Sequence, residues 1–140
     1  MANGRKGCIP RRSAAALQKE QWKITHDPLY LAVGGVEMYI DLGAEPLLAA
    51  EKGDEKIAVE VKSFLQPSTI SEFHTAVGQF LNYRRALRAT DPERHLYLAV
   101  PAEIHATFFA LPFIRDGVAE YQLHLLVYDA EERVITVWQK

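Results

Sequence analysis

The stretch that decides the fold is IAVEVKSF, at residues 57–64. Its β-branched residues predict a strand, yet Glu60 and Lys62 interrupt the apolar run. Because side chains alternate along a strand, Glu60 and Lys62 share one face and the flanking valines point to the other. The strand therefore carries a carboxylate and an ammonium together, on a face that apolar side chains would otherwise occupy.

The composition is typical of a globular domain, with 49% hydrophobic and 24% charged residues among 140. We expect a single domain over residues 1–140, with residues 1–10 as a mobile basic tail. No apolar stretch is long enough to span a membrane and the N-terminus lacks a signal peptide, so we expect a cytoplasmic protein. The single cysteine, Cys8, excludes an internal disulfide and lacks the spacing of a zinc site.

The net charge of −2 is not typical of a protein that binds nucleic acid through its whole surface. Basic residues nevertheless gather in two places, Arg5 to Arg12 and Arg84 to Arg88. Either group can contact phosphates, although groups this small are more often solvated side chains at a tail or a helix end.

Hydrophobic periodicity predicts alternating helices and strands. The expected helices span residues 11–21, 70–87 and, with a break at Pro112, 102–119. The expected strands span residues 22–25, 29–33, 36–41, 47–52, 56–64, 95–100, 123–129 and 133–138. Turns at Gly34-Gly35 and at residues 53–55 make the early strands antiparallel hairpins. This order predicts a three-layer α/β or α+β domain with a mixed central sheet and flanking helices.

A second carboxylate would turn the charged strand into a candidate metal site. Asp41 ends the predicted strand at 36–41 and would lie beside Glu60 if the two strands are neighbours in the sheet. Two carboxylates that hold a hard divalent cation, with a lysine nearby, can activate water and stabilise the charge of a phosphorane. Taken alone, however, Glu60 and Lys62 are also typical of a solvated strand face with a surface ion pair.

The helix expected after this strand adds a polar pair. Gln79 and Tyr83 are four residues apart and lie on one helix face, in line with Glu72 and Ala76. Gln79 is then a group that positions a phosphate or a metal-bound water, with Tyr83 as its partner. Alternatively, Tyr83 is an aromatic residue at the edge of the core and Gln79 is its polar neighbour.

Together, Asp41, Glu60-Val61-Lys62 and Gln79-xxx-Tyr83 resemble the PD-(D/E)xK nuclease pattern of the restriction-endonuclease-like superfold. The sequence more closely resembles the XisH family, the fdxN-element excision controlling factors of cyanobacteria, over roughly residues 15–138. Four segments carry this resemblance: ITHDPLYLAVGGVEMYIDLGAE (24–45), AAEKGDEKIAVEVKSFL (49–65), ISEFHTAVGQFLNYRRAL (70–87) and LYLAVP (96–101).

The XisH resemblance implies a restriction-endonuclease-like fold and a role in programmed excision of a DNA element alongside a site-specific recombinase. It also implies a protein partner of the XisI type and leaves a homo-oligomer open. In the nuclease pattern, Asp41 and Glu60 bind Mg²⁺ or Mn²⁺. Lys62 orients water or stabilises the phosphorane, and Gln79 and Tyr83 position the DNA backbone.

The chain departs from these patterns in two places. Ile40 stands before Asp41 where the superfold often has a proline. The segment GCIPRR replaces a polar, His-containing turn of the family, which leaves Glu20 only a weak candidate for an outer carboxylate.

Three functions therefore remain open. The first is a metal-dependent nuclease. The second is a non-catalytic regulatory subunit that acts through a partner on DNA, and the third is an interaction module in which the EVK charges are merely paired.

Overall fold

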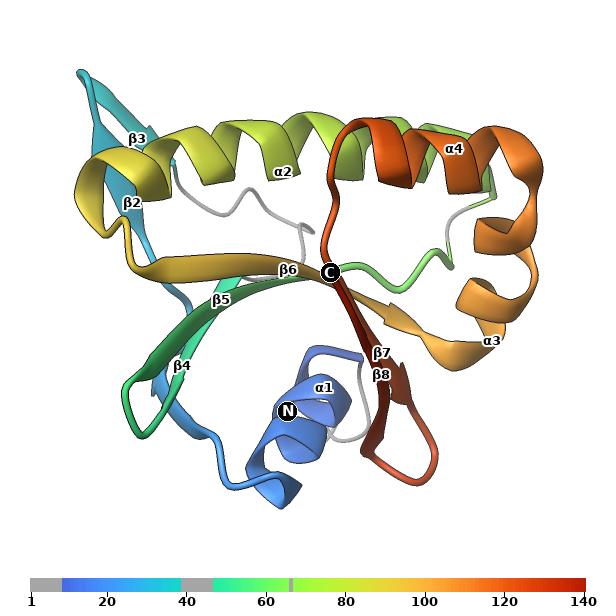
Figure 1. Ribbon diagram of the computed structural model, residues 1–140, viewed down its shortest axis with the longest axis horizontal. Coiled ribbons are helices and arrows are strands. Elements are labelled where there is room, and N and C mark those ends of the chain that lie inside the picture. Colours follow the sequence, from blue (N-terminus) through green and yellow to red (C-terminus); the bar gives the residue numbers. More distant parts are fainter. Residues whose placement is uncertain (1–8, 39–46, 66) are drawn as a thin grey trace.

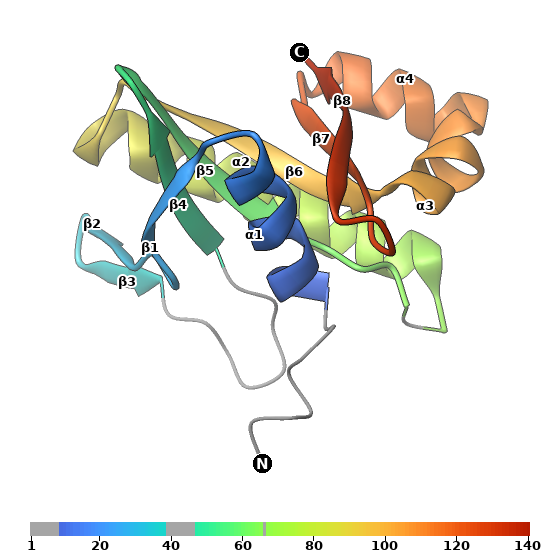
Figure 2. The same cartoon turned by 90° about the horizontal axis from the view of Figure 1, so that it is seen from below.

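The computed structural model describes residues 9–38, 47–65 and 67–140, which form three layers (Figure 1). A β-sheet is the middle layer. One of its faces is covered by α1 (Ile9–Lys19), and the other by α2 (Thr69–Thr90) and α4 (Pro112–Glu120), as Figures 1 and 2 show. The predicted three-layer α/β architecture with a mixed central sheet is confirmed.

Within the described residues the central sheet has six strands, in the order β1-β4-β5-β6-β7-β8. Their bounds are Lys23–His26 (β1), Leu47–Lys52 (β4), Glu55–Val61 (β5), Arg94–Pro101 (β6), Leu125–Asp129 (β7) and Val134–Gln139 (β8). The pairs β5–β6 and β6–β7 are parallel, whereas the outer pairs are antiparallel. The predicted hairpins β4–β5 and β7–β8 are confirmed.

The unit that positions the candidate site is the crossover β5–α2–β6. Side chains from Ile57 to Val61 are all buried, as expected of a strand covered on both faces. Ser68 caps α2 because its hydroxyl accepts the N–H of Ser71 at 3.2 Å. From this cap α2 runs back across the sheet and buries Phe73, Ala76 and Phe80.

Two hydrophobic cores lie on the two faces of the sheet. The core beneath α2 includes Leu47, Ala58, Leu98 and Phe80, and the core against α1 includes Val59. Alternation along β5 thus assigns Ala58 and Val59 to opposite cores, as the period of two predicts.

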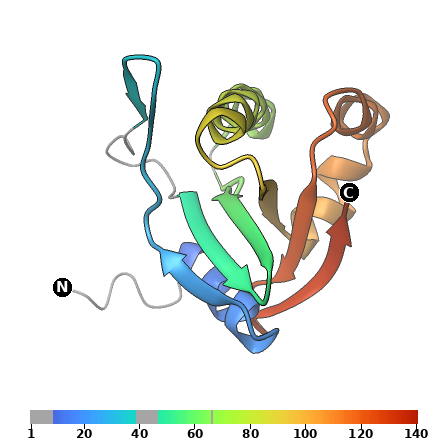
Figure 3. The same cartoon turned by 60° about the vertical axis from the view of Figure 1, so that its left-hand side comes forward.

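The hairpin predicted from residues 29–33 and 36–41 is confirmed as far as the described residues reach. β2 (Leu31–Val33) and β3 (Val36–Met38) pair only with each other within the described chain, through a turn at Gly34 and Gly35 with φ of 58° and 81°. This hairpin stands apart from the central sheet, beside α2 (Figures 1 and 3). The place beside β5 belongs to β4, whose residues 47–50 are buried, whereas Val36 and Glu37 in β3 are exposed.

The other predicted elements need only small corrections. The first helix begins at Ile9 and has Pro10 in its first turn, where a missing N–H costs nothing. The segment 102–119 divides at Pro112 as predicted, into α3 (Ala102–Ala106), the 3₁₀ turn η2 (Phe108–Ala110) and α4. No helix among the described residues is both long and apolar enough to cross a membrane.

The buried guanidinium of Arg94 bridges three strands at the end of the sheet where β5 begins. Arg94, at the start of β6, donates from Nη1 to the carbonyl of Ile57 at 3.0 Å. Its Nε bonds the carboxylate of Asp91 at 3.0 Å, and its Nη2 bonds the carboxylate of Glu51 in β4 at 3.3 Å. Arg94 is 8% exposed, so its charge depends on these acceptors.

We expect Arg94→Met to lower the free energy of unfolding by about 2 kcal/mol, because it leaves a buried carbonyl and two carboxylates without their donor. Urea unfolding followed by circular dichroism measures this change. The matched control is Arg115→Met: both members of the Arg115–Asp116 pair are mostly exposed, and its loss should cost less than about 0.5 kcal/mol. Equal effects of the two substitutions would show that Arg94 does not tie the strands.

Candidate functional site

Glu60 lies near the carboxyl end of β5, on the face covered by α2. Its neighbours in the sheet are Leu47 on β4 and Leu98 on β6, and both belong to the core beneath α2. Glu60 itself is 1% exposed. A carboxylate is thus set into a face of leucines and shielded from water, where electrostatic interactions are stronger than at the surface.

Lys62 follows at the point where β5 ends. Its backbone N–H donates to the carbonyl of Ala99 at 3.1 Å, which keeps the chain against β6 for one more residue. The residue is 7% exposed. The interpretation of Glu60 and Lys62 as a solvated surface pair is therefore wrong. Burying a charge is costly unless it is paired and hydrogen-bonded, so the fold around these two residues has to compensate for their burial.

Two contacts fix the segment that follows Lys62 and leads to α2. Phe64 has φ of 57°, in the left-handed region that a residue with a bulky side chain rarely adopts. Its N–H donates to Oε2 of Glu72 at 2.9 Å. Its ring packs edge-on against Phe109, with 5.4 Å between the ring centroids. A strained backbone conformation is thus maintained beside the buried charges by α2 and by the aromatic residues after β6.

The helix face that begins with Glu72 continues through Ala76 to Gln79 and Tyr83. At about 1.5 Å per helical residue, Gln79 lies ~10 Å along α2 from Glu72. Glu72 is the residue of this face whose contact with the segment after β5 is seen, through the N–H of Phe64.

Gln79 and Tyr83 are both half-buried, and Tyr83 packs against the core beneath α2. This location agrees with the interpretation of Tyr83 as a residue at the edge of the core. It equally allows both side chains to border the space above β5, so their assignment to the site stays a prediction.

Asp41 lies outside the described residues. The strand pairing that would have brought it to Glu60 is absent from the described chain, because β3 pairs with β2, and β5 lies between β4 and β6. Leu47, where the chain is again described, is directly opposite Glu60. The approach of Asp41 to Glu60 therefore stays a prediction.

A metal site at Glu60 stays a prediction. Among the described residues, no three His, Cys, Asp or Glu side chains cluster around one point. Glu60 offers carboxylate oxygens, the ligand type that Mg²⁺ and Mn²⁺ prefer, and the second carboxylate is assigned to Asp41. Glu20 does not contribute: it accepts the indole N–H of Trp138 at 3.2 Å and lines a hollow with Glu55, at the opposite end of β5.

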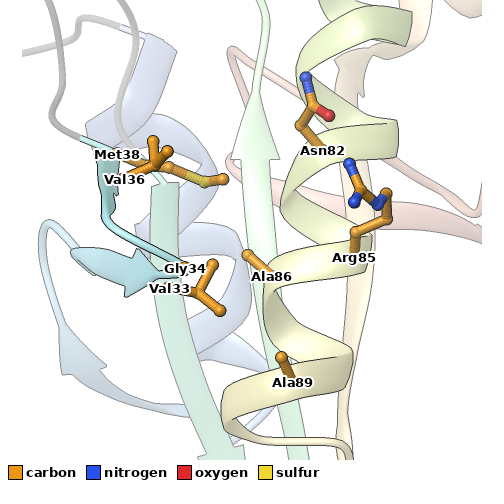
Figure 4. A pocket seen from close by; sticks show the side chains of 8 residues that line it. All are labelled: Val33, Gly34, Val36, Met38, Asn82, Arg85, Ala86 and Ala89. Atoms are coloured by element: carbon orange, nitrogen blue, oxygen red, sulfur yellow. The ribbon is translucent and has the colours of Figure 1, made fainter.

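A hollow of about 470 Å³ lies elsewhere, between the β2–β3 hairpin and the second half of α2 (Figure 4). Val33, Val36 and Met38 line it from the hairpin, and Asn82 and Arg85 border it from α2. It includes none of the predicted site residues. We therefore locate the candidate site by the buried charges of β5 and not by this hollow.

Two residues that organise the site were not predicted to do so. Glu72 was placed on the correct helix face, but its bond to the Phe64 N–H joins segments whose contact no local pattern indicates. The left-handed conformation of Phe64 has no signal in the sequence, because glycine or asparagine is expected there.

Comparisons with known proteins give a consistent result. The family XisH, described as XisH protein, matches residues 6–136. A crystal structure of an XisH family protein from Nostoc punctiforme is 52% identical, with a TM-score of 0.88 over 94% of this chain and 98% of that one. The fdxN element excision controlling factor protein from Anabaena variabilis is 50% identical, with the same TM-score and coverage. No curated protein matches the sequence.

We expect Glu72→Ala to destabilise the segment after Lys62 by about 1.5 kcal/mol, because the Phe64 N–H loses a charged acceptor. Amide hydrogen exchange at Phe64 should accelerate, which NMR measures directly. Glu72→Gln keeps an acceptor oxygen and should restore most of the protection. Unchanged exchange at Phe64 in Glu72→Ala would contradict the anchoring role.

Proposed function

The chain belongs to the XisH family, and from that premise we propose that it is a controlling factor for the programmed excision of a DNA element. We further propose that its three-layer fold is restriction-endonuclease-like and carries a nuclease-type metal site of the PD-(D/E)xK kind. A site-specific recombinase would act alongside it.

The observation that carries the proposal is the burial of Glu60 and Lys62 at the end of β5. Two charged side chains are buried in a core, next to a residue with a strained backbone conformation, and functional residues are commonly found in such surroundings. A carboxylate 1% exposed cannot serve as a solubilising surface charge. A role in binding a cation explains why it is kept.

Each residue then has a stated role. Asp41 and Glu60 hold Mg²⁺ or Mn²⁺, which when bound would polarise a water and a phosphate oxygen. Lys62 orients the attacking water or stabilises negative charge on the phosphorane. Gln79 hydrogen-bonds the DNA backbone, and Tyr83 fixes the side chain of Gln79 from one helical turn away.

We expect Mn²⁺ to bind the wild-type protein and not Glu60→Gln or Asp41→Asn. Each substitution removes the negative charge of a ligand and leaves the shape of the side chain nearly unchanged. Isothermal titration measures binding, and a plasmid-nicking assay on the same samples measures cleavage. Lys62→Met should still bind Mn²⁺ and nick at least about a hundredfold more slowly.

The control for these substitutions is Glu55→Gln, which removes an exposed carboxylate from the start of the same strand. It should bind metal and nick DNA as the wild type does. Circular dichroism verifies that every variant is folded. Failure of the folded wild type to bind Mn²⁺ would rule out the metal-dependent nuclease.

A second candidate function, a non-catalytic subunit that acts through an XisI-type protein, is supported by exposed apolar side chains beside the site. Leu65 is 76% exposed and directly follows the strained Phe64. Phe113, at the start of α4, is 74% exposed. Phe64 contacts Phe108 and Phe109, which come shortly before Phe113 in the chain, so these apolar groups gather at one end of the molecule. Such groups commonly mark protein interfaces.

We expect Leu65→Ser with Phe113→Ser to weaken binding of an XisI-type protein at least about tenfold, because both side chains lose apolar contact area. Co-purification and titration with that protein measure the change. Val134→Ser with Val137→Ser, on exposed positions of β8, is the matched control and should bind normally. If Glu60→Gln binds the partner normally while the apolar variant does not, the regulatory role is separate from metal binding.

A further inference from the structure

A second hollow, of about 160 Å³, lies on the opposite flank of α2 from Gln79 and Tyr83. Its apolar floor includes Phe80 and Leu87, and its polar groups are basic: Arg84, Arg88, Arg94, His95 and His124. One water occupies about 30 Å³ in the liquid, so the hollow has room for a small hydrated anion. No acidic side chain of the described residues lines it.

The charges of Arg84 and Arg88 are not neutralised within the described part of the chain. The two residues are one helical turn apart on the same face of α2, where like charges repel. Ion pairs among the described residues include neither of them, whereas Arg94 is balanced by Asp91 and Glu51. The hollow therefore has an excess of positive charge in a protein whose net charge is −2.

Arg84 is held in place with most of its donors still available. Its Nη1 donates to the carbonyl of Gln122 at 3.0 Å, and its guanidinium lies over the ring of Phe80 at 5.4 Å. A guanidinium has five N–H donors, and this bond uses one. A fixed, planar group of this kind is suited to a phosphate, which it can bind through two parallel hydrogen bonds.

His124 lies at this hollow, close enough to Arg84 for the positive charge to affect its pKa. Its backbone carbonyl accepts the N–H of Leu98 at 2.8 Å, which fixes the residue next to β6. Burial is the main cause that lowers its pKa, followed by the charge of Arg84, with smaller contributions from His95 and Lys140. Burial and the charge of Arg88 likewise lower the pKa of Arg84.

We propose that this hollow is a phosphate-binding site, in which Arg84 and Arg88 hold the phosphate and His95 and His124 border it. The phosphate comes either from a nucleic-acid backbone or from a free phosphate compound. The site is independent of the metal site at Glu60, since the two lie on different flanks of α2.

The test follows the pKa of His124 by NMR, with inorganic phosphate added and with KCl at the same ionic strength as the control for screening. A bound phosphate stabilises the imidazolium, so we expect phosphate to raise the pKa by about one unit more than KCl does. Affinity for phosphate should accordingly rise as the pH falls through this pKa.

Arg88→Gln keeps the bond of Arg84 to Gln122 and should reduce the response, and Arg84→Gln with Arg88→Gln should abolish it. Arg85→Gln is the matched control, because Arg85 is on the same helical turn but borders the other hollow (Figure 4). An equal response to phosphate and KCl, or a full response in the double variant, would overturn the proposal.

A short DNA duplex then identifies the source of the phosphate. If DNA raises the pKa of His124 as inorganic phosphate does, and Arg84→Gln with Arg88→Gln loses this effect, the site binds a backbone phosphate. If only inorganic phosphate acts, the site binds a free phosphate compound. Neither readout requires metal or cleavage, so failure of the nuclease proposal leaves this test unaffected.

Discussion

The constraint on which the rest of the structure depends is the burial of β5 on both faces. The strand lies between β4 and β6 and is covered by α1 on one side and α2 on the other. Every second side chain of β5 must therefore enter the core beneath α2, and Glu60 occupies one of these positions. Because the burial of a charge is unfavourable, the surrounding structure has to stabilise it, and the leucines at its sides cannot. The strained backbone of Phe64 and its anchor on Glu72 belong to the same region.

Helix α2 separates two chemically different regions. Successive residues are about 100° apart around a helix, so Gln79 and Arg88 point to nearly opposite sides. The flank that carries Glu72 contacts the segment after β5 through Phe64, whereas the flank that carries Arg84 and Arg88 adjoins β6 and His124. The net charge of the whole chain, −2, does not indicate that the two flanks differ. The basic residues at the end of α2, which the sequence alone could not distinguish from solvated side chains, border a hollow because His124 and Phe80 are brought beneath them.

Sequence patterns were sufficient to predict the layers, since α2 has a buried face with a period of 3.6 residues and β5 is a short run of β-branched residues. The sequence left the sheet neighbour of the strand at 36–41 open, because an alternating segment pairs equally well in an isolated hairpin or in the main sheet, and only the burial of Leu47–Ala50 decides between them. The EVK charges were ambiguous for a similar reason: a strand has the same sequence whether a helix covers that face or water does. The bond from Phe64 to Glu72 could not be predicted, since it depends on a left-handed residue that no propensity favours.

The distance between the two proposed sites limits how one nucleic acid could bind to both of them. Gln79 and Arg84 are separated by five residues, about 8 Å along α2, but their side chains emerge on different flanks of a helix roughly 10 Å wide. A single phosphate cannot contact both rows. Phosphates along one strand of duplex DNA are about 3.4 Å apart along its axis. If DNA occupies both sites, the phosphate held by Arg84 is therefore several nucleotides from the one near Glu60, or on the other strand. The basic hollow would then align the duplex on α2, and the chemistry would depend on Glu60 and Lys62.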